Sequence, residues 1–162
     1  MSVAVFTVVA LIAAGALLAI ADANRKAQTF KSVVNNLNFA LESVARNVRT
    51  GFSYSTSAFP SGVPCPNGHQ SGISFTSQDN EPVSYYLNGS QIMRKVRSGN
   101  AIGVTAPEVK VERFCFFLAG TGENDNEQPR ALMLVGGFMQ EKPKLKSRFD
   151  IQTFITQRLL DS

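Results

Sequence analysis

The stretch that decides the fold is SVAVFTVVALIAAGALLAIA, residues 2–21, which contains no charged side chain. At 1.5 Å per residue, an α-helix of this length spans about 30 Å, the hydrocarbon thickness of a bilayer. We therefore expect a transmembrane anchor. Two alternatives stay open: Ala19-Ile20-Ala21 has the small-x-small form of a signal cleavage site, and a helix this apolar can also be buried in a soluble protein.

Charge is concentrated directly after the apolar segment. Residues 22–50 hold five cations and two anions, which supply +3 of the formal net charge of +4. The remaining 112 residues are nearly neutral, with eleven cations and ten anions. The positive-inside rule would place Arg25 and Lys26 in the cytoplasm, but a leader before the span would change the balance, so charge alone leaves the orientation open. The composition excludes collagen, a disulfide-dense mini-protein and wholesale disorder.

An amphipathic pattern follows the anchor. Apolar residues recur at spacings of four, three, four, three and four, which is a heptad seam: Phe30, Val34, Leu37, Leu41, Val44 and Val48. No proline occurs before Pro60, so we expect one helix from about residue 2 to 49. Gly51 would follow as the C′ residue of that helix.

The rest of the chain is predicted to be β-structure. Residues 51–71 are rich in Ser, Gly and Pro and are expected to form a loop. Short alternating segments surround Asn88-Gly89, a strong hairpin signal, and three longer strands are expected at 109–118, 131–138 and 149–159. The predicted fold is α+β. A long N-terminal helix, residues 1–50 (2–21 transmembrane, 22–50 amphipathic), packs on an antiparallel β-sheet head, residues 51–162.

The predicted order of elements resembles that of a known protein family. Four stretches of sequence resemble the same family: residues 22–28 (DANRKAQ), 36–43 (NLNFALES), 128–130 (QPR) and 157–161 (QRLLD). They resemble type IV pilin-like proteins, which include the pseudopilins of type II secretion systems. In that family, prepilin peptidase cleaves at a glycine before a Phe-Thr-Leu-x-Glu run. That motif is absent from this sequence, whose residues 2–6 resemble the segment just beyond the glutamate.

The resemblance implies a structural subunit of a type IV pilus or a type II secretion pseudopilus, with no enzymatic activity and no cofactor. Its partners would be other pilin-like subunits in a homo- or heteropolymer, the inner-membrane assembly machinery, and membrane lipid before assembly. It would be a single-pass membrane protein with an extracytoplasmic head, at the cell surface or in the periplasm once assembled. The alternative is a monomeric membrane-anchored binding domain, such as an adhesin or a DNA receptor.

Small residues in the anchor suit the polymer. Ala10, Ala13, Ala16 and Ala19 recur every three residues and would form a shallow groove that lets helices approach closely. The other interpretation is that alanine is simply a good helix former.

The two cysteines also leave two interpretations. Cys65 lies in the expected loop and Cys115 in an expected strand. An extracytoplasmic head would favour a disulfide between them, and two buried free thiols are the alternative.

Candidates for catalysis are few. His69 is the only histidine, and Cys65 with His69 is two ligands short of a zinc site. A sortase-like transpeptidase would use His69, Cys115 and Arg130 in that chain order. However, Arg113-Phe114-Cys115 stands where such enzymes have Thr-Leu-x-Thr-Cys.

Two further segments suggest ligands. Residues 120–127, GTGENDNE, hold three carboxylates that could bind calcium, or they are a solvated connection between strands. Lys142, Lys144, Lys146 and Arg148 alternate, so in one extended segment they would project to one side. In that arrangement they would contact DNA phosphates; the alternatives are that they protect a strand edge or solvate a hairpin.

Overall fold

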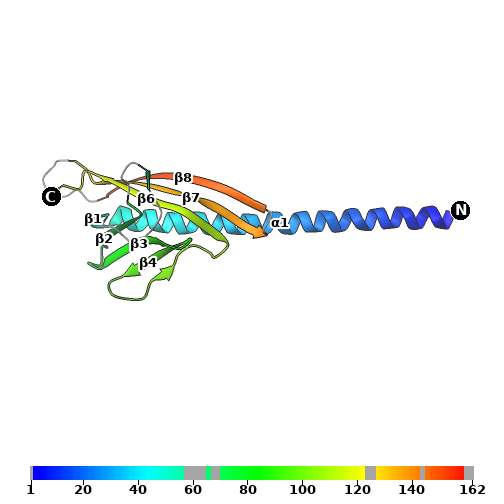
Figure 1. Ribbon diagram of the computed structural model, residues 1–162, viewed down its shortest axis with the longest axis horizontal. Helices are drawn as coiled ribbons and strands as arrows, with labels where there is room; N and C mark the ends of the chain where they lie inside the picture. Colours follow the sequence, from blue (N-terminus) through cyan, green and yellow to red (C-terminus); the bar gives the residue numbers. More distant parts are fainter. Residues whose placement is uncertain (1, 57–64, 67–69, 123–126, 143–144, 159–162) are drawn as a thin grey trace. The chain divides into compact units, whose positions relative to one another are not determined.

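The structure, a computed structural model, describes residues 2–56, 65–66, 70–122, 127–142 and 145–158; at residues 2, 29, 140–142 and 145–146 it describes the backbone alone. By internal contacts the chain divides into two compact units, Met1–Asn35 and Asn36–Ser162. The division falls inside helix α1, Ser2–Thr50, so residues 36–50 belong with the strands rather than with the apolar segment (Figure 1). The predicted α+β class, one long N-terminal apolar helix with antiparallel sheets, is confirmed.

Helix α1 ends one residue beyond the predicted position, and two carbonyl groups of its last turn accept hydrogen bonds from residues beyond the helix. The Val48 carbonyl accepts the Gly51 N–H at 3.2 Å and the Tyr54 hydroxyl at 2.6 Å, and the Arg49 carbonyl accepts the Arg158 N–H at 2.9 Å. Gly51 follows the helix as expected but without a left-handed φ. It is required for another reason, because a Cβ atom there would lie 2.3 Å from the Phe75 ring.

Eight strands form two antiparallel sheets. Sheet 1 has the order β1-β2-β3-β4-β5, and sheet 2 has the order β6-β7-β8. The strands are β1 Phe52–Ser55, β2 Gly72–Thr76, β3 Pro82–Asn88, β4 Gln91–Val96, β5 Ile102–Gly103, β6 Val109–Ala119, β7 Arg130–Lys142 and β8 Leu145–Thr156. Strand β1 lies within the stretch that was expected to be a loop. Asn88 pairs with Gln91, so the two residues of the β3–β4 turn are Gly89 and Ser90 rather than the expected Asn88 and Gly89. Gly89 has a positive φ of 59°, which suits a glycine in such a turn.

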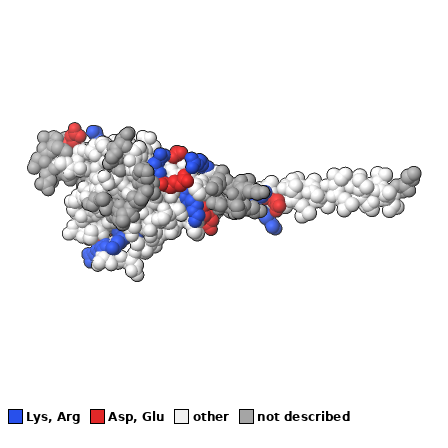
Figure 2. All heavy atoms as spheres, in the orientation of Figure 1, with Lys and Arg blue, Asp and Glu red and all other residues white. Residues whose placement is uncertain are grey.

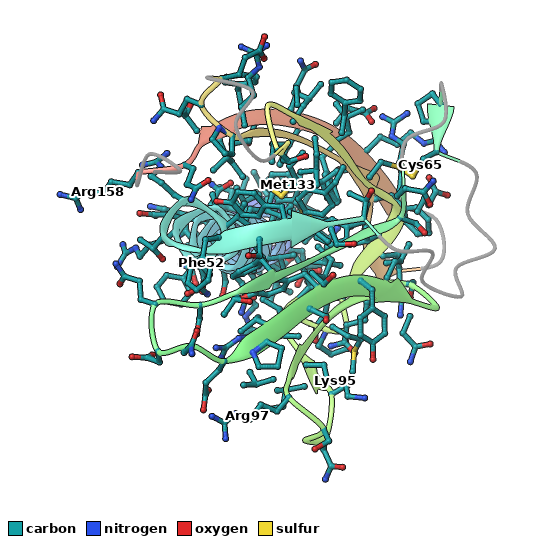
Figure 3. The ribbon with its side chains drawn as sticks, turned by 90° about the vertical axis from the view of Figure 1, so that its left-hand side faces the viewer. Phe52, Cys65, Lys95, Arg97, Met133 and Arg158 are labelled. Atoms are coloured by element: carbon teal, nitrogen blue, oxygen red, sulfur yellow. A yellow bond between two sulfur atoms is a disulfide. The ribbon has the colours of Figure 1, made fainter. Side chains whose placement is uncertain are left out.

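The C-terminal part of α1, residues 36–50, lies between the two sheets (Figures 1 and 3). Its buried face lies among apolar side chains that both sheets bury: Ile73, Phe75, Val83, Tyr85, Leu87 and Ile92 of sheet 1, and Phe114, Phe116, Met133, Val135 and Ile155 of sheet 2. Figure 3 shows Met133 on the side of sheet 2 that faces the helix. This helix segment is therefore the centre of the head's core.

Backbone contacts join the two sheets along the edge of β6. Gln70 and Phe116 exchange two backbone hydrogen bonds, at 3.2 and 2.8 Å, and the Val111 N–H donates to the Ser90 carbonyl at 2.9 Å. Since Gln70 precedes β2 and Ser90 connects β3 to β4, both contacts bring sheet 1 to the β6 edge. That edge of sheet 2 is thus largely closed by the chain itself.

One buried polar contact fixes the helix on sheet 1. The Asn47 side-chain amide donates to the Tyr85 hydroxyl at 2.7 Å, and the Tyr85 side chain is fully buried. Burial raises the pKa of Tyr85 above its ordinary value of 10.0, and the Asn47 hydrogen bond and the nearby Arg94 charge oppose that rise. The folded head therefore favours the neutral, protonated form of the Tyr85 side chain.

The buried face predicts the effect of truncating Leu41. Leu41 is 6% exposed, so Leu41→Ala should lower the free energy of unfolding by about 2–5 kcal/mol through lost burial and a cavity. Phe39→Ala is the matched control, since Phe39 lies on the same helix with 76% of its side chain exposed. Thermal unfolding of both variants in detergent measures the difference. Equal melting temperatures for the two variants would contradict the helix-on-sheet core.

The raised pKa of Tyr85 predicts a loss of stability in alkali. Because the folded head keeps a proton that the unfolded chain releases, this contribution is fully present below about pH 10 and disappears as pH rises through the folded pKa. Tyr85→Phe should remove that dependence while costing about 0.5–1.5 kcal/mol at neutral pH, since the Asn47 amide loses its acceptor. Urea unfolding from pH 8 to 11 tests both effects, with Tyr86→Phe as control. An unchanged pH profile in Tyr85→Phe would argue against the assignment.

Candidate functional site

The apolar segment of α1 is the first candidate surface. Every described side chain from Val3 to Ala21 is exposed, including Phe6 and Leu11 at 74% each. By length and composition, α1 is the one helix among the described residues that could cross a membrane. Figure 2 shows no charged atoms along this segment. Its chemistry is that of a lipid-facing or helix-facing surface rather than of a reactive site.

The small residues lie on that exposed surface. Ala10, Ala13, Ala16 and Ala19 are all exposed, and a Cβ atom added at Gly15 would meet no described atom within 4 Å. Within the unit Met1–Asn35, these positions are therefore open to close approach by another helix. Their packing in a polymer stays a prediction.

The structure buries only the later part of the predicted seam. Leu37, Leu41, Val44 and Val48 are at most 6% exposed, whereas Phe30 is 46% exposed and Val34 is half-buried. Phe30 and Val34 belong to the unit Met1–Asn35, and the other four belong to the unit with the sheets. The heptad spacing continues across the division, but the buried core begins only at Leu37.

The opposite face of the same helix segment is exposed. Phe39 lies there with Glu42, Ser43 and Arg46, beside a shallow hollow of about 110 Å³. Glu42 and Arg46 form an exposed ion pair at 3.4 Å. Residues 36–50 thus present one face to the sheets and an apolar side chain on the other.

Cys65 and Cys115 are joined by a disulfide, with their Cα atoms 5.8 Å apart. Cys115 is fully buried in β6, and Cys65 is half-buried in the connection between β1 and β2. The bond adds a covalent link to the same β6 edge that Gln70 contacts. It closes a chain separation of 50 residues and ties the connection to sheet 2.

The four alternating basic residues do not share one extended segment. Strand β7 ends at Lys142, and β8 begins at Leu145 and contains Lys146, so the run bends back as a hairpin. Lys144 lies outside the described residues, as do the side chains of Lys142 and Lys146. Arg148 is exposed and pairs with Glu112 at 3.1 Å. Contact of these residues with a polyanion stays a prediction, and Figure 2 shows cations and anions close together on the face of the head that it draws.

The candidates for metal and enzyme chemistry are described only in part. Residues 123–126 of the proposed calcium segment and His69 lie outside the described residues, and Glu127 pairs with Arg130 at 3.4 Å. Within the described part of the chain, no group of three or more His, Cys, Asp or Glu residues could hold a metal ion. Cys115 is bonded to Cys65 and has no thiol to act as a nucleophile.

The structure also reveals a surface that the sequence did not predict. Phe117, Leu132 and Phe154 are direct cross-strand neighbours on the outer side of sheet 2, and the two phenylalanines are 50% and 60% exposed. We call them the outer apolar row. Two rows away, Arg113 pairs with Asp150 across Gly136, where a Cβ atom would lie 2.5 Å from the Asp150 carboxylate. A side chain at position 136 would therefore displace the ends of the Arg113 and Asp150 side chains.

The disulfide generates a prediction about compartment and stability. The chain isolated from an oxidising compartment should have a mass two protons below the reduced value and should resist alkylation. Cys65→Ser should lower the free energy of unfolding by about 4 kcal/mol, the loop-closure entropy for this separation. Reduced wild type is the matched control and should unfold like the variant. Ready alkylation of both native cysteines would contradict the bond.

Comparison with known proteins adds no relative: no protein-family model, no curated protein and no solved structure matches the chain.

Proposed function

We propose that the chain is a pilin-like structural subunit of a type IV pilus or a type II secretion pseudopilus. The observation that carries the proposal is that the two ends of α1 have different surroundings. Residues 3–21 are apolar and exposed on all sides, while residues 36–50 form the centre of a β-sheet head. A subunit that leaves a bilayer for a filament needs both parts: an anchor that exchanges lipid for neighbouring helices, and a folded head that stays intact.

Two exposed features of α1 support helix-to-helix assembly. The small residues Ala10, Ala13, Ala16 and Ala19 allow close approach, which drives association where lipid and side chains are equally apolar. Phe39 exposes 76% of its side chain on the face that the sheets leave uncovered. A neighbouring subunit would cover both surfaces. The partners are then other copies or related subunits, with inner-membrane machinery to extract them.

The disulfide supports an extracytoplasmic head. Disulfides persist in oxidising compartments and are rare where glutathione keeps thiols reduced. The Cys65–Cys115 bond therefore favours the periplasm or the cell surface for residues 36–162. This orientation is opposite to the one that Arg25 and Lys26 alone would favour under the positive-inside rule.

The second candidate is a monomeric anchored binding domain, and the outer apolar row favours it. A receptor head needs a contact surface, and contiguous exposed apolar side chains on a sheet are a common form of one. Phe117, Leu132 and Phe154 provide such a surface without any contribution from the anchor. The two functions therefore differ in which part of the chain makes the essential contact.

Larger side chains in the anchor should distinguish the filament subunit from the monomeric binding domain. Ala13→Leu with Ala16→Leu should leave membrane insertion and head stability unchanged, because both changes add only apolar volume. The double variant should nevertheless abolish filaments by holding the helices apart. Ala4→Leu with Thr7→Leu is the control, since it adds apolar volume on the opposite side of the helix, about 180° from the centre of Ala13 and Ala16. Electron microscopy of cells expressing each variant with the complete assembly machinery gives the readout.

Normal filaments from the Ala13/Ala16 variant would refute the packing role of the small residues. A wild-type chain that forms no filaments under the same conditions would favour the anchored binding domain.

A further inference from the structure

Three cations lie close together in the sequence just past the apolar segment. Arg25, Lys26 and Lys31 lie in α1 between two uncharged stretches, residues 2–21 and 32–41. We call them the cationic band. With Asp22, the ten residues 22–31 carry a net charge of +2, and all three cationic side chains are exposed. The charge is therefore confined to one level of the helix.

That level corresponds to the head-group layer of a bilayer. At 1.5 Å per residue, Arg25 and Lys26 lie about 6 and 7.5 Å beyond Ala21, and Lys31 lies about 15 Å beyond it. The head-group layer on each side of the hydrocarbon is about 5–7.5 Å thick. Side chains in an α-helix tilt toward its N-terminus, which here is the direction of the apolar segment. The stem of Lys31 brings its ammonium group closer to that layer, and the group then lies within a Debye length of about 8–10 Å of the phosphates and adds to their attraction.

The cationic band surrounds the helix rather than lining one face. At about 100° per residue, successive members are separated by about 100°, 140° and 120° around the axis. A helix face that served a protein partner would gather its charges on one side. A distribution around the whole circumference instead fits a partner that surrounds the helix, as lipid does.

No tryptophan or tyrosine lies in α1 beside the cationic band. Tryptophan and tyrosine commonly hold a membrane helix at the interface. The chain contains no tryptophan, and its three tyrosines are Tyr54, Tyr85 and Tyr86, all beyond the end of α1. Past the apolar segment, the side chains of α1 suited to an interface are therefore the cations Arg25, Lys26 and Lys31.

We infer that the cationic band binds the phosphate groups of anionic phospholipids in the leaflet at the C-terminal end of the span. The inference rests on the membrane anchoring of the proposed function and adds the class of lipid. Contact between the cations and the anionic head groups holds α1 at a fixed depth. An assembling subunit must break these contacts when it leaves the bilayer.

The test measures which lipid contacts the helix. The full chain is reconstituted in phosphatidylcholine bilayers with a trace of spin-labelled phosphatidylglycerol or spin-labelled phosphatidylcholine. Electron paramagnetic resonance gives the fraction of each label held at the protein. Wild type should favour phosphatidylglycerol roughly fivefold, the effect of one effective surface charge, and the preference should decline at high salt.

Matched variants locate the effect. Arg25→Gln with Lys26→Gln should bring the preference close to one, because the net charge of residues 22–31 becomes zero. Arg46→Gln with Arg49→Gln removes the same charge from residues 36–50 and should leave the preference unchanged. Equal loss in both variants, or no preference in wild type, would overturn the inference.

Flotation with pure phosphatidylcholine vesicles separates this inference from the anchor itself. A chain that floats with neutral vesicles but shows no phosphatidylglycerol preference overturns the cationic band alone. A chain that does not float overturns the anchor and the band together.

Discussion

Burial of one helix stripe is the interaction on which the head depends. Leu37, Leu41, Val44 and Val48 lie on one face of α1, and neither sheet has an apolar core without them. Sheet 1 and sheet 2 each cover part of that stripe, so they must also meet each other. Their meeting line is the edge of β6, where backbone hydrogen bonds and the Cys65–Cys115 disulfide join them. The helix therefore explains both why there are two sheets and where they touch.

Much of this fold could be predicted from local patterns. The uninterrupted helix to about residue 49, the antiparallel strands and the hairpin after β3 follow from proline placement, alternation and turn residues. The division into two sheets could not be predicted, because alternation reveals which residues face a core but not which strands pair. The sequence pattern also could not show that the buried core begins at Leu37 rather than at Phe30. Phe30 has the right spacing, but burial depends on how far the sheets reach.

The surfaces were harder to predict than the elements. Residues 114–118 are a continuous apolar run, so alternation cannot show that Phe116 points inward while Phe117 points outward. A register shift between Val111 and Arg113 sets that choice, and no local residue signals it. The basic run at 142–148 shows the same alternation whether it forms one strand or two strands of a hairpin, so this pattern does not distinguish the two arrangements. The Asn47–Tyr85 contact spans 38 residues and leaves no trace in either local pattern.

The hydrogen bond from Arg158 to the carbonyl of Arg49 has a consequence for biosynthesis. The end of the helix receives its last partner from a residue synthesised about 110 positions later, just after β8, the strand that completes sheet 2. At about 5–20 residues per second, the helix stripe stays incompletely covered for about 5–20 s after it leaves the ribosome. A nascent chain with an uncovered apolar stripe is prone to aggregate unless it is held. The apolar segment leaves the ribosome before the head is complete, so under the proposed membrane anchoring the chain would reach the bilayer while the sheets still form, and nascent chains would be kept apart.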